Sequence, residues 1–60
     1  MNTKLIIDYM EREGLTIEQM AKRCNMPIAT LRRVLDGDTS TLRLSGLIGL
    51  LDTLGLIILI

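Results

Sequence analysis

Residues 14–37 read GLTIEQMAKRCNMPIATLRRVLDG, and this stretch decides the fold of the chain. Thr16 is followed three residues later by Gln19, which is the spacing of a capping box at the start of a helix. The helix that this predicts runs to about Arg23, and its apolar residues fall on one inner side: Ile17, Met20, Ala21 and Cys24.

A tight turn is predicted directly after this helix. Asn25 is among the non-glycine residues that most readily adopt a left-handed backbone. Pro27 fits the first turn of a following helix, where its missing N–H costs nothing, and that helix should run to about Asp36 and end at Gly37. Two short helices joined by three residues is the spacing of a helix-turn-helix, and Ala21 is small enough for their steep crossing. Such a motif offers the outer face of its second helix to the major groove of DNA.

The second of these helices is expected to have two distinct faces. Its inward positions are apolar: Leu31, Val34 and Leu35. Its outward positions are Ile28, Ala29, Arg32 and Arg33. Cys24 has no partner at the spacing of a metal site or a catalytic pair, so we expect it in the core with Met10, Met20 and Met26.

The flanking residues predict two further helices and a strand. The first helix is capped by Asn2 or Thr3, ends at Gly14 and carries one apolar stripe: Leu5, Ile6, Tyr9 and Met10. The last helix follows a polar connector, residues 38–41, and has an inner side made of Leu44, Leu47, Ile48, Leu50, Leu51 and Leu54. The apolar residues 56–60 are too few for a helix and are predicted as a strand. The expected fold is all-α, with four to five short helices and a short C-terminal strand.

Composition limits the chemistry that the chain can perform. Its 60 residues suffice for one small domain, which folds with little margin and gains from a partner. With no His and one Cys, it has no internal disulfide, no usual structural zinc site and no Ser/His or Cys/His catalysis. One Tyr, without Phe or Trp, gives little surface for stacking single-stranded bases. We therefore expect a binding module rather than an enzyme, without metal or cofactor, in a reducing cytoplasm.

Charge is balanced overall but unevenly distributed. The chain carries seven basic and seven acidic residues, and residues 19–43 hold five of the basic ones but two of the acidic ones. A small basic patch attracts phosphate, although a solvated helix face explains the same charges equally well. Residues 44–60 hold one charge, Asp52, within an apolar stretch. This stretch is shorter than the ~20 residues of a membrane span, and a carboxylate inside the bilayer is costly, so a span is disfavoured.

The 24 residues quoted above resemble, without a gap, the XRE family of phage-repressor-like helix-turn-helix domains. The similar positions include the opening Leu-Thr pair and Ala21, Met26, Thr30, Leu31, Arg33, Val34 and Gly37. The resemblance continues through the leucines of the last helix and covers about residues 3–56. It implies a lambda-repressor-like fold and binding of double-stranded DNA, with repression of a small phage or bacterial operon, its own, as the expected role.

By position, the resemblance assigns roles to individual side chains. Base readout falls on the outward face of the second helix of the motif, namely Ile28, Ala29, Arg32 and Arg33, with Arg33 the expected reader of a guanine. Phosphate contacts fall on Thr16, Ile17, Thr30, Thr39, Ser40 and Arg43. The chain departs from the family at four places, with Ile17 for glutamine, Asn25 for glycine, Pro27 for serine and Leu35-Asp36 for Glu-Asn. Asp36 then faces phosphate with the wrong sign.

The predicted strand has no partner within an otherwise helical chain. We expect it to pair with the same strand of a second copy, and some antitoxins of the family end in a similar strand pair. The expected dimer interface is Leu56, Ile57, Ile58, Leu59 and Ile60, which divides the chain into a DNA-binding part, 1–55, and a dimerising part, 56–60. The dimer would place two recognition helices ~34 Å apart on an inverted repeat. The other interpretation is that the tail continues the last helix.

Two other functions stay open at this point. One is a protein-interaction module, such as an antitoxin or anti-repressor partner, whose basic face is incidental. The other is a peptide bound to a membrane through residues 44–60.

Overall fold

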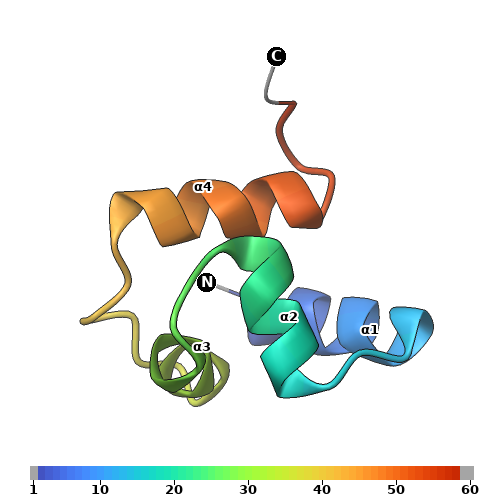
Figure 1. Ribbon diagram of the computed structural model, residues 1–60, viewed down its shortest axis with the longest axis horizontal. Helices are drawn as coiled ribbons and strands as arrows, with labels where there is room; N and C mark the ends of the chain where they lie inside the picture. Colours follow the sequence, from blue (N-terminus) through green and yellow to red (C-terminus); the bar gives the residue numbers. More distant parts are fainter. Residues whose placement is uncertain (1, 59–60) are drawn as a thin grey trace.

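The computed structural model describes residues 2–58, in which four α-helices are connected by short loops (Figure 1). The helices are α1 (Thr3–Glu13), α2 (Ile17–Cys24), α3 (Ile28–Leu35) and α4 (Leu44–Thr53). α2 packs against both α3 and α4, and α1 packs against α3. The predicted all-α architecture is confirmed, and the two helices of the motif lie within one residue of their predicted bounds.

Side-chain caps begin the first two helices as the sequence predicts. The backbone N–H of Lys4 donates to Asn2 Oδ1 at 3.0 Å at the start of α1. At the start of α2, the N–H of Gln19 donates to Thr16 Oγ1 at 3.2 Å, and the N–H of Thr16 donates to Gln19 Oε1 at 2.9 Å. This reciprocal pair is the capping box, and it satisfies two N–H groups that a helix end leaves free.

The turn between α2 and α3 depends on Asn25, which adopts φ 55° and ψ 49° in the left-handed region. Its N–H donates to the Lys22 carbonyl at 3.1 Å, and the next N–H, of Met26, donates to the Ala21 carbonyl at 3.0 Å. These two bonds form the left-handed helix ending that glycine usually makes. The prediction that Pro27 lies in the first turn of α3 is wrong by one residue. Pro27 is the N-cap of α3, with ψ 145°, because its extended backbone precedes the first helical residue rather than joining the first turn.

The core gathers the inward faces of all four helices. Its buried residues are Ile6, Met20, Ala21, Cys24, Met26, Leu31, Val34 and Leu50. The predicted core position of Cys24 is confirmed, and burial raises the pKa of its thiol, so the thiol stays protonated and acts as a packing group.

Two predicted core residues lie at the surface instead. Leu5 is 50% exposed because Ile6 takes the inward position on α1, so the buried stripe is narrower than the sequence indicates. Leu44 is 72% exposed because it is the first residue of α4, and the buried residues of that helix, Gly46 and Leu50, begin further along it.

α4 approaches the end of α2 more closely than side chains normally allow. A Cβ built on Gly49 would overlap the carbonyl oxygen of Cys24 and would lie 2.9 Å from its carbonyl carbon. In the next turn of α4, the Thr53 hydroxyl donates to the Arg23 carbonyl at 3.1 Å, which satisfies one of the free carbonyls at the end of α2. Glycine at position 49 therefore allows α4 to pack closely against the end of α2.

The predicted C-terminal strand is not formed in the described part of the tail, residues 56–58. These residues do not continue α4 either. α4 ends because Gly55 adopts φ 75° and the N–H of Leu56 donates back to the Leu51 carbonyl at 2.9 Å. A strand needs hydrogen bonds from a neighbouring strand, and the described residues of a single chain offer none. Leu59 and Ile60, also predicted in this strand, lie outside the described residues.

Candidate nucleic-acid interface

The turn sets α2 and α3 at a crossing where little side-chain volume fits. Ala21 is 2% exposed there, and Met26 of the turn is buried beside it. α3 is thereby anchored along one side by Leu31 and Val34, which are 0% and 1% exposed. The opposite side of this helix is left open to solvent.

The four residues predicted to read bases all lie on that open side. Ile28, Ala29, Arg32 and Arg33 are exposed, with Ile28 at 37%. Neither guanidinium has an ion-pair partner within residues 2–58. The arrangement is a helix with a buried apolar side and a free side that ends in two forked cationic groups.

The loop after α3 brings a carboxylate close to one of these arginines. The N–H of Asp38 donates to the Arg33 carbonyl at 2.8 Å. Hydrogen bonding by the side chain of Ser40, and by its N–H at 2.9 Å, lowers the pKa of Asp38, with a smaller contribution from the charge of Arg33. Asp38 therefore stays ionised, and Ser40, a predicted phosphate contact, is held by a carboxylate instead.

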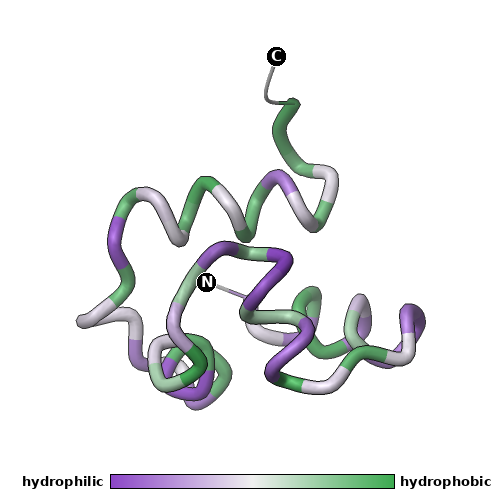
Figure 2. The backbone as a smooth tube through the Cα atoms, viewed as in Figure 1, coloured by the Kyte–Doolittle hydropathy of each residue, from purple (hydrophilic) through white to green (hydrophobic). Residues whose placement is uncertain are grey.

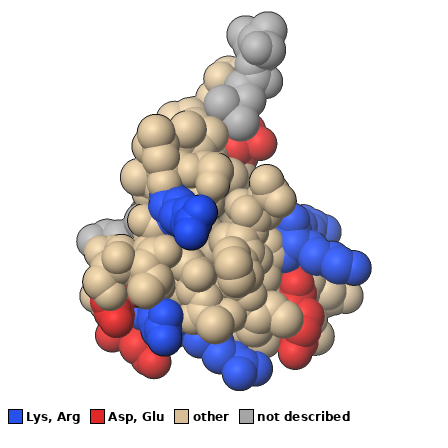
Figure 3. Space-filling view, turned by 60° about the vertical axis from the view of Figure 1, so that its left-hand side comes forward, with Lys and Arg blue, Asp and Glu red and all other residues tan. Residues whose placement is uncertain are grey.

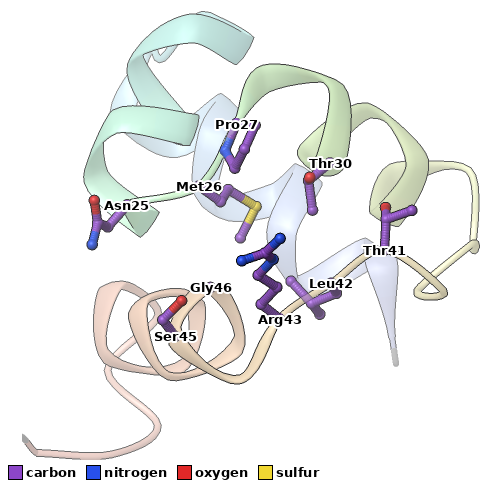
Figure 4. A pocket seen from close by; sticks show the side chains of 9 residues that line it. All are labelled: Asn25, Met26, Pro27, Thr30, Thr41, Leu42, Arg43, Ser45 and Gly46. Atoms are coloured by element: carbon purple, nitrogen blue, oxygen red, sulfur yellow. The ribbon is translucent and has the colours of Figure 1, made fainter.

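Three of the predicted phosphate-binding residues come together between α3 and α4. Thr30 and Arg43 line one small pocket, and Thr39 lines an adjoining hollow that also includes Arg43. In Figure 4 the Arg43 side chain reaches into the pocket between Met26 and Leu42. The pocket also contains three further polar residues. The sequence predicted Asn25 only as the turn residue and Thr41 only as part of the polar connector, and it did not single out Ser45. Hydroxyl-bearing residues spaced two to four apart along a loop and a helix start are the signal that points to Thr41 and Ser45.

The beginning of α2 is a separate element of the candidate interface. Thr16 uses its side-chain oxygen to accept from Gln19, which leaves its hydroxyl hydrogen for another acceptor. The Ile17 side chain packs against the core, so at this position the backbone N–H at the helix start is the group that can reach an anion. Glu18 adds a negative charge to the same turn, which weakens that attraction.

The basic side chains do not merge into one field. Figure 3 shows separate blue areas on the face it presents, divided by uncharged surface and accompanied by acidic side chains. Arg23 is taken up by structure, since it donates to the Tyr9 hydroxyl at 2.9 Å and lies 3.7 Å from a carboxylate oxygen of Glu13. Arg23 is therefore engaged within the protein, whereas Lys22, Arg32, Arg33 and Arg43 have no ion-pair partner within residues 2–58.

A protein-family model described as a helix-turn-helix domain matches residues 8–56. The chain belongs to this helix-turn-helix family. The match runs from within α1 through α2, α3 and α4 to the residue after Gly55. No curated protein and no solved structure matches the chain.

Membership of the helix-turn-helix family is consistent with the XRE-like resemblance and indicates a DNA-binding regulator. The second helix of the motif is α3, and its open side carries the two arginines. Within residues 2–58, no helix of this domain has the length and apolarity needed to cross a membrane.

Proposed function

We propose that the chain is a sequence-specific regulator that binds double-stranded DNA as a homodimer and represses its own small phage or bacterial operon. The observation that supports this proposal most strongly is the division of α3 into a buried side, Leu31 and Val34, and an open side with Arg32 and Arg33. A helix exposed in this way fits the major groove, where base edges differ from pair to pair.

In this proposal, the residues on the open side of α3 contact both the bases and the phosphate backbone of DNA. Arg33 reads a guanine, because a guanidinium forms two parallel hydrogen bonds with the O6 and N7 of that base. Arg32 holds a phosphate nearby. Ile28 and Ala29, which are apolar and exposed, contact thymine methyl groups at the beginning of the helix.

Backbone contacts flank this readout on two sides. On one side, Arg43 with Thr30, Thr39 and the hydroxyls of the adjoining pocket binds one phosphate. On the other side, the hydroxyl of Thr16 and the N–H of Ile17 bind another at the start of α2. Ser40, which hydrogen-bonds to Asp38, is assigned no phosphate in this proposal. Such contacts fix the position of the protein on the duplex and carry no sequence information.

Selection of binding sites from random double-stranded oligonucleotides tests the proposal. We expect enrichment of an inverted repeat whose half-sites lie one helical turn, ~34 Å, apart. Enrichment of a single half-site would contradict the dimer, and no enrichment by the folded protein would contradict sequence-specific binding.

The Arg43→Ala substitution should weaken binding to every DNA sequence by a similar factor. One phosphate contact is lost, so the slope of log K against log salt should become shallower by ~1. Fluorescence anisotropy on operator and scrambled DNA over a salt series measures both quantities. Lys22→Ala is the matched control, because Lys22 is an exposed cation of α2 that lines no pocket of the interface. A loss confined to one DNA sequence would contradict a phosphate role for Arg43.

The Ile58→Lys substitution should separate the dimer. Ile58 is 84% exposed in the single chain, and a charge at this position would have to be buried between two tails. Sedimentation equilibrium should show a monomer at concentrations where the natural chain is dimeric. Leu44→Lys alters another exposed aliphatic residue, at the end of α4 away from the tail, and should leave the dimer intact. An Ile58→Lys protein that is still dimeric would contradict pairing through the tail.

A protein-interaction module is the second candidate function. Six large aliphatic side chains of the described chain are more than a third exposed, which favours a macromolecular partner: Leu5, Ile7, Ile28, Leu44, Leu56 and Ile58. The salt series separates the two candidates, because phosphate contacts make affinity fall steeply with salt and apolar contacts do not.

A further inference from the structure

A shallow hollow with apolar and charged lining lies between α1 and the residues that follow α4. It is lined by Leu5, Asp8, Tyr9, Arg12, Leu54 and Leu56. Leu5 is 50% exposed and Leu56 is 58% exposed, so both walls of the hollow present unburied leucine. The tail then leaves the body of the protein as a hydrophobic segment (Figures 1 and 2), with Ile58 still more exposed. None of these groups belongs to the candidate DNA interface.

Two opposite charges stand at the rim of this hollow without pairing to each other. Asp8 and Arg12 are four residues apart on α1, a spacing at which such side chains often form an ion pair. Here the guanidinium of Arg12 lies over the Tyr9 ring, 5.5 Å from its centroid. Within residues 2–58, Asp8 has no ion-pair partner. One carboxylate and one guanidinium are therefore available on a single helix face.

We propose that this face binds a second copy of the chain, with the two α1 helices antiparallel across a two-fold axis. In that arrangement Asp8 meets the partner's Arg12, and Arg12 meets the partner's Asp8. A two-fold interface uses the same patch on both copies, so a patch that holds one charge of each sign beside apolar groups is complementary to itself. The proposal deepens the dimer of the proposed function and rests on it, because it adds α1 to the interface of the tail.

Charge and area both favour a second copy as the occupant. α1 carries two basic residues, Lys4 and Arg12, against three acidic ones, Asp8, Glu11 and Glu13, so its surface does not attract phosphate. A stable interface buries about 800 Å² on each partner, which is about one fifth of the 4171 Å² surface of this chain. The exposed tail residues alone are too few to supply that area. The adjoining face of α1 adds to the surface that a second copy can contact.

A charge-swap series tests the arrangement by sedimentation equilibrium. The single variants Asp8→Arg and Arg12→Asp each place like charges opposite each other, so the dimer dissociation constant should rise at least about tenfold. The double variant Asp8→Arg/Arg12→Asp, and an equimolar mixture of the two single variants, should return to within about threefold of the natural chain. Glu11→Arg makes the same charge change on the same helix outside the hollow, and it should leave dimerisation unchanged. Circular dichroism melting confirms that each variant is folded.

The possible results distinguish the α1 interface from the homodimer of the proposed function, on which it rests. Single variants that dimerise like the Glu11→Arg control would overturn the α1 interface while leaving the dimer itself intact. Single variants that dissociate without rescue in the double variant would also overturn it, because the charges would then not be paired. A natural chain that stays monomeric at the highest concentration measured would overturn the dimer of the proposed function together with this interface.

Discussion

Replacing Gly49 with alanine is expected to lower the free energy of unfolding by about 2 kcal/mol, although alanine is the better helix former. The helical preference alone would stabilise α4 by about 1 kcal/mol. The added Cβ, however, would overlap the Cys24 carbonyl, which is backbone at the end of α2 and cannot turn aside as a side chain can. Overpacking of this kind costs about 1–3 kcal/mol and occasionally more. For a chain of 60 residues, whose total stability is on the order of 3–9 kcal/mol, this is a large part of the whole.

Gly46→Ala is the matched control for this prediction. Gly46 lies in the same helix, and its new Cβ would meet the end of a flexible side chain, Leu42 Cδ1, at 3.1 Å. We expect Gly46→Ala to be neutral or stabilising by up to about 1 kcal/mol. Thermal melting compares the two variants, since each 1 kcal/mol shifts the Tm of so small a domain by about 4–8 °C. A Gly49→Ala protein as stable as Gly46→Ala would contradict the close seating of α4 on α2.

The Arg33→Ala substitution should cost about 1–3 kcal/mol in binding to the operator, or roughly five- to 150-fold in Kd. The loss should be specific, because Arg33 is proposed to form two hydrogen bonds with one guanine. Changing that base pair should therefore lower the affinity of the natural protein for the operator but leave the affinity of the variant unchanged. Affinity measurements on a set of operators with single base-pair changes test both statements.

Arg32→Ala is the control that separates loss of base readout by Arg33 from general loss of positive charge. Both arginines lie exposed on the open side of α3, and both are cations, so general loss of charge affects them equally. Arg32 is proposed to hold phosphate, so its variant should weaken all sequences alike and retain the base preference. An Arg33→Ala protein with unchanged affinity on the mapped operator would remove Arg33 from base readout.

The helices of the motif were predictable because local signals agree with the tertiary structure. The Thr16–Gln19 capping box, the left-handed Asn25 and the spacing of Leu31 and Val34 each act within one turn of helix. Hydrophobic periodicity also identified the open side of α3 correctly. These features need no knowledge of distant residues, which is why the chain sequence is enough to predict them.

Features that depend on distant contacts were missed or mistaken. The fit of Gly49 on Cys24 and the hydrogen bond from Thr53 to Arg23 join α2 to α4, and neither has a local signal beyond the glycine itself. Leu44 reads as a core residue by spacing, but its place at the beginning of α4 leaves it exposed. The strand expected at residues 56–60 needs a partner that a single chain does not supply, so the described part of the tail shows an irregular backbone.

The candidate DNA interface was predictable only in part for the same reason. The open side of α3 follows from periodicity, whereas the pocket at Arg43 forms where the turn after α2 meets the start of α4. Asn25, Thr41 and Ser45 belong to that pocket because two loops converge. The pairing of Ser40 with Asp38 likewise depends on the loop conformation and reduces the fitness of Ser40 as a phosphate contact.

The central claim is that this helix-turn-helix domain binds double-stranded DNA in a sequence-dependent manner. The most direct measurement is a gel shift with the DNA just upstream of its own coding sequence, against scrambled DNA of equal length, at two salt concentrations. The account predicts tight retardation of the upstream DNA, weaker retardation of the scrambled DNA, and a steep loss of both as salt rises. A folded dimer that retards neither DNA at the lower salt concentration would contradict it.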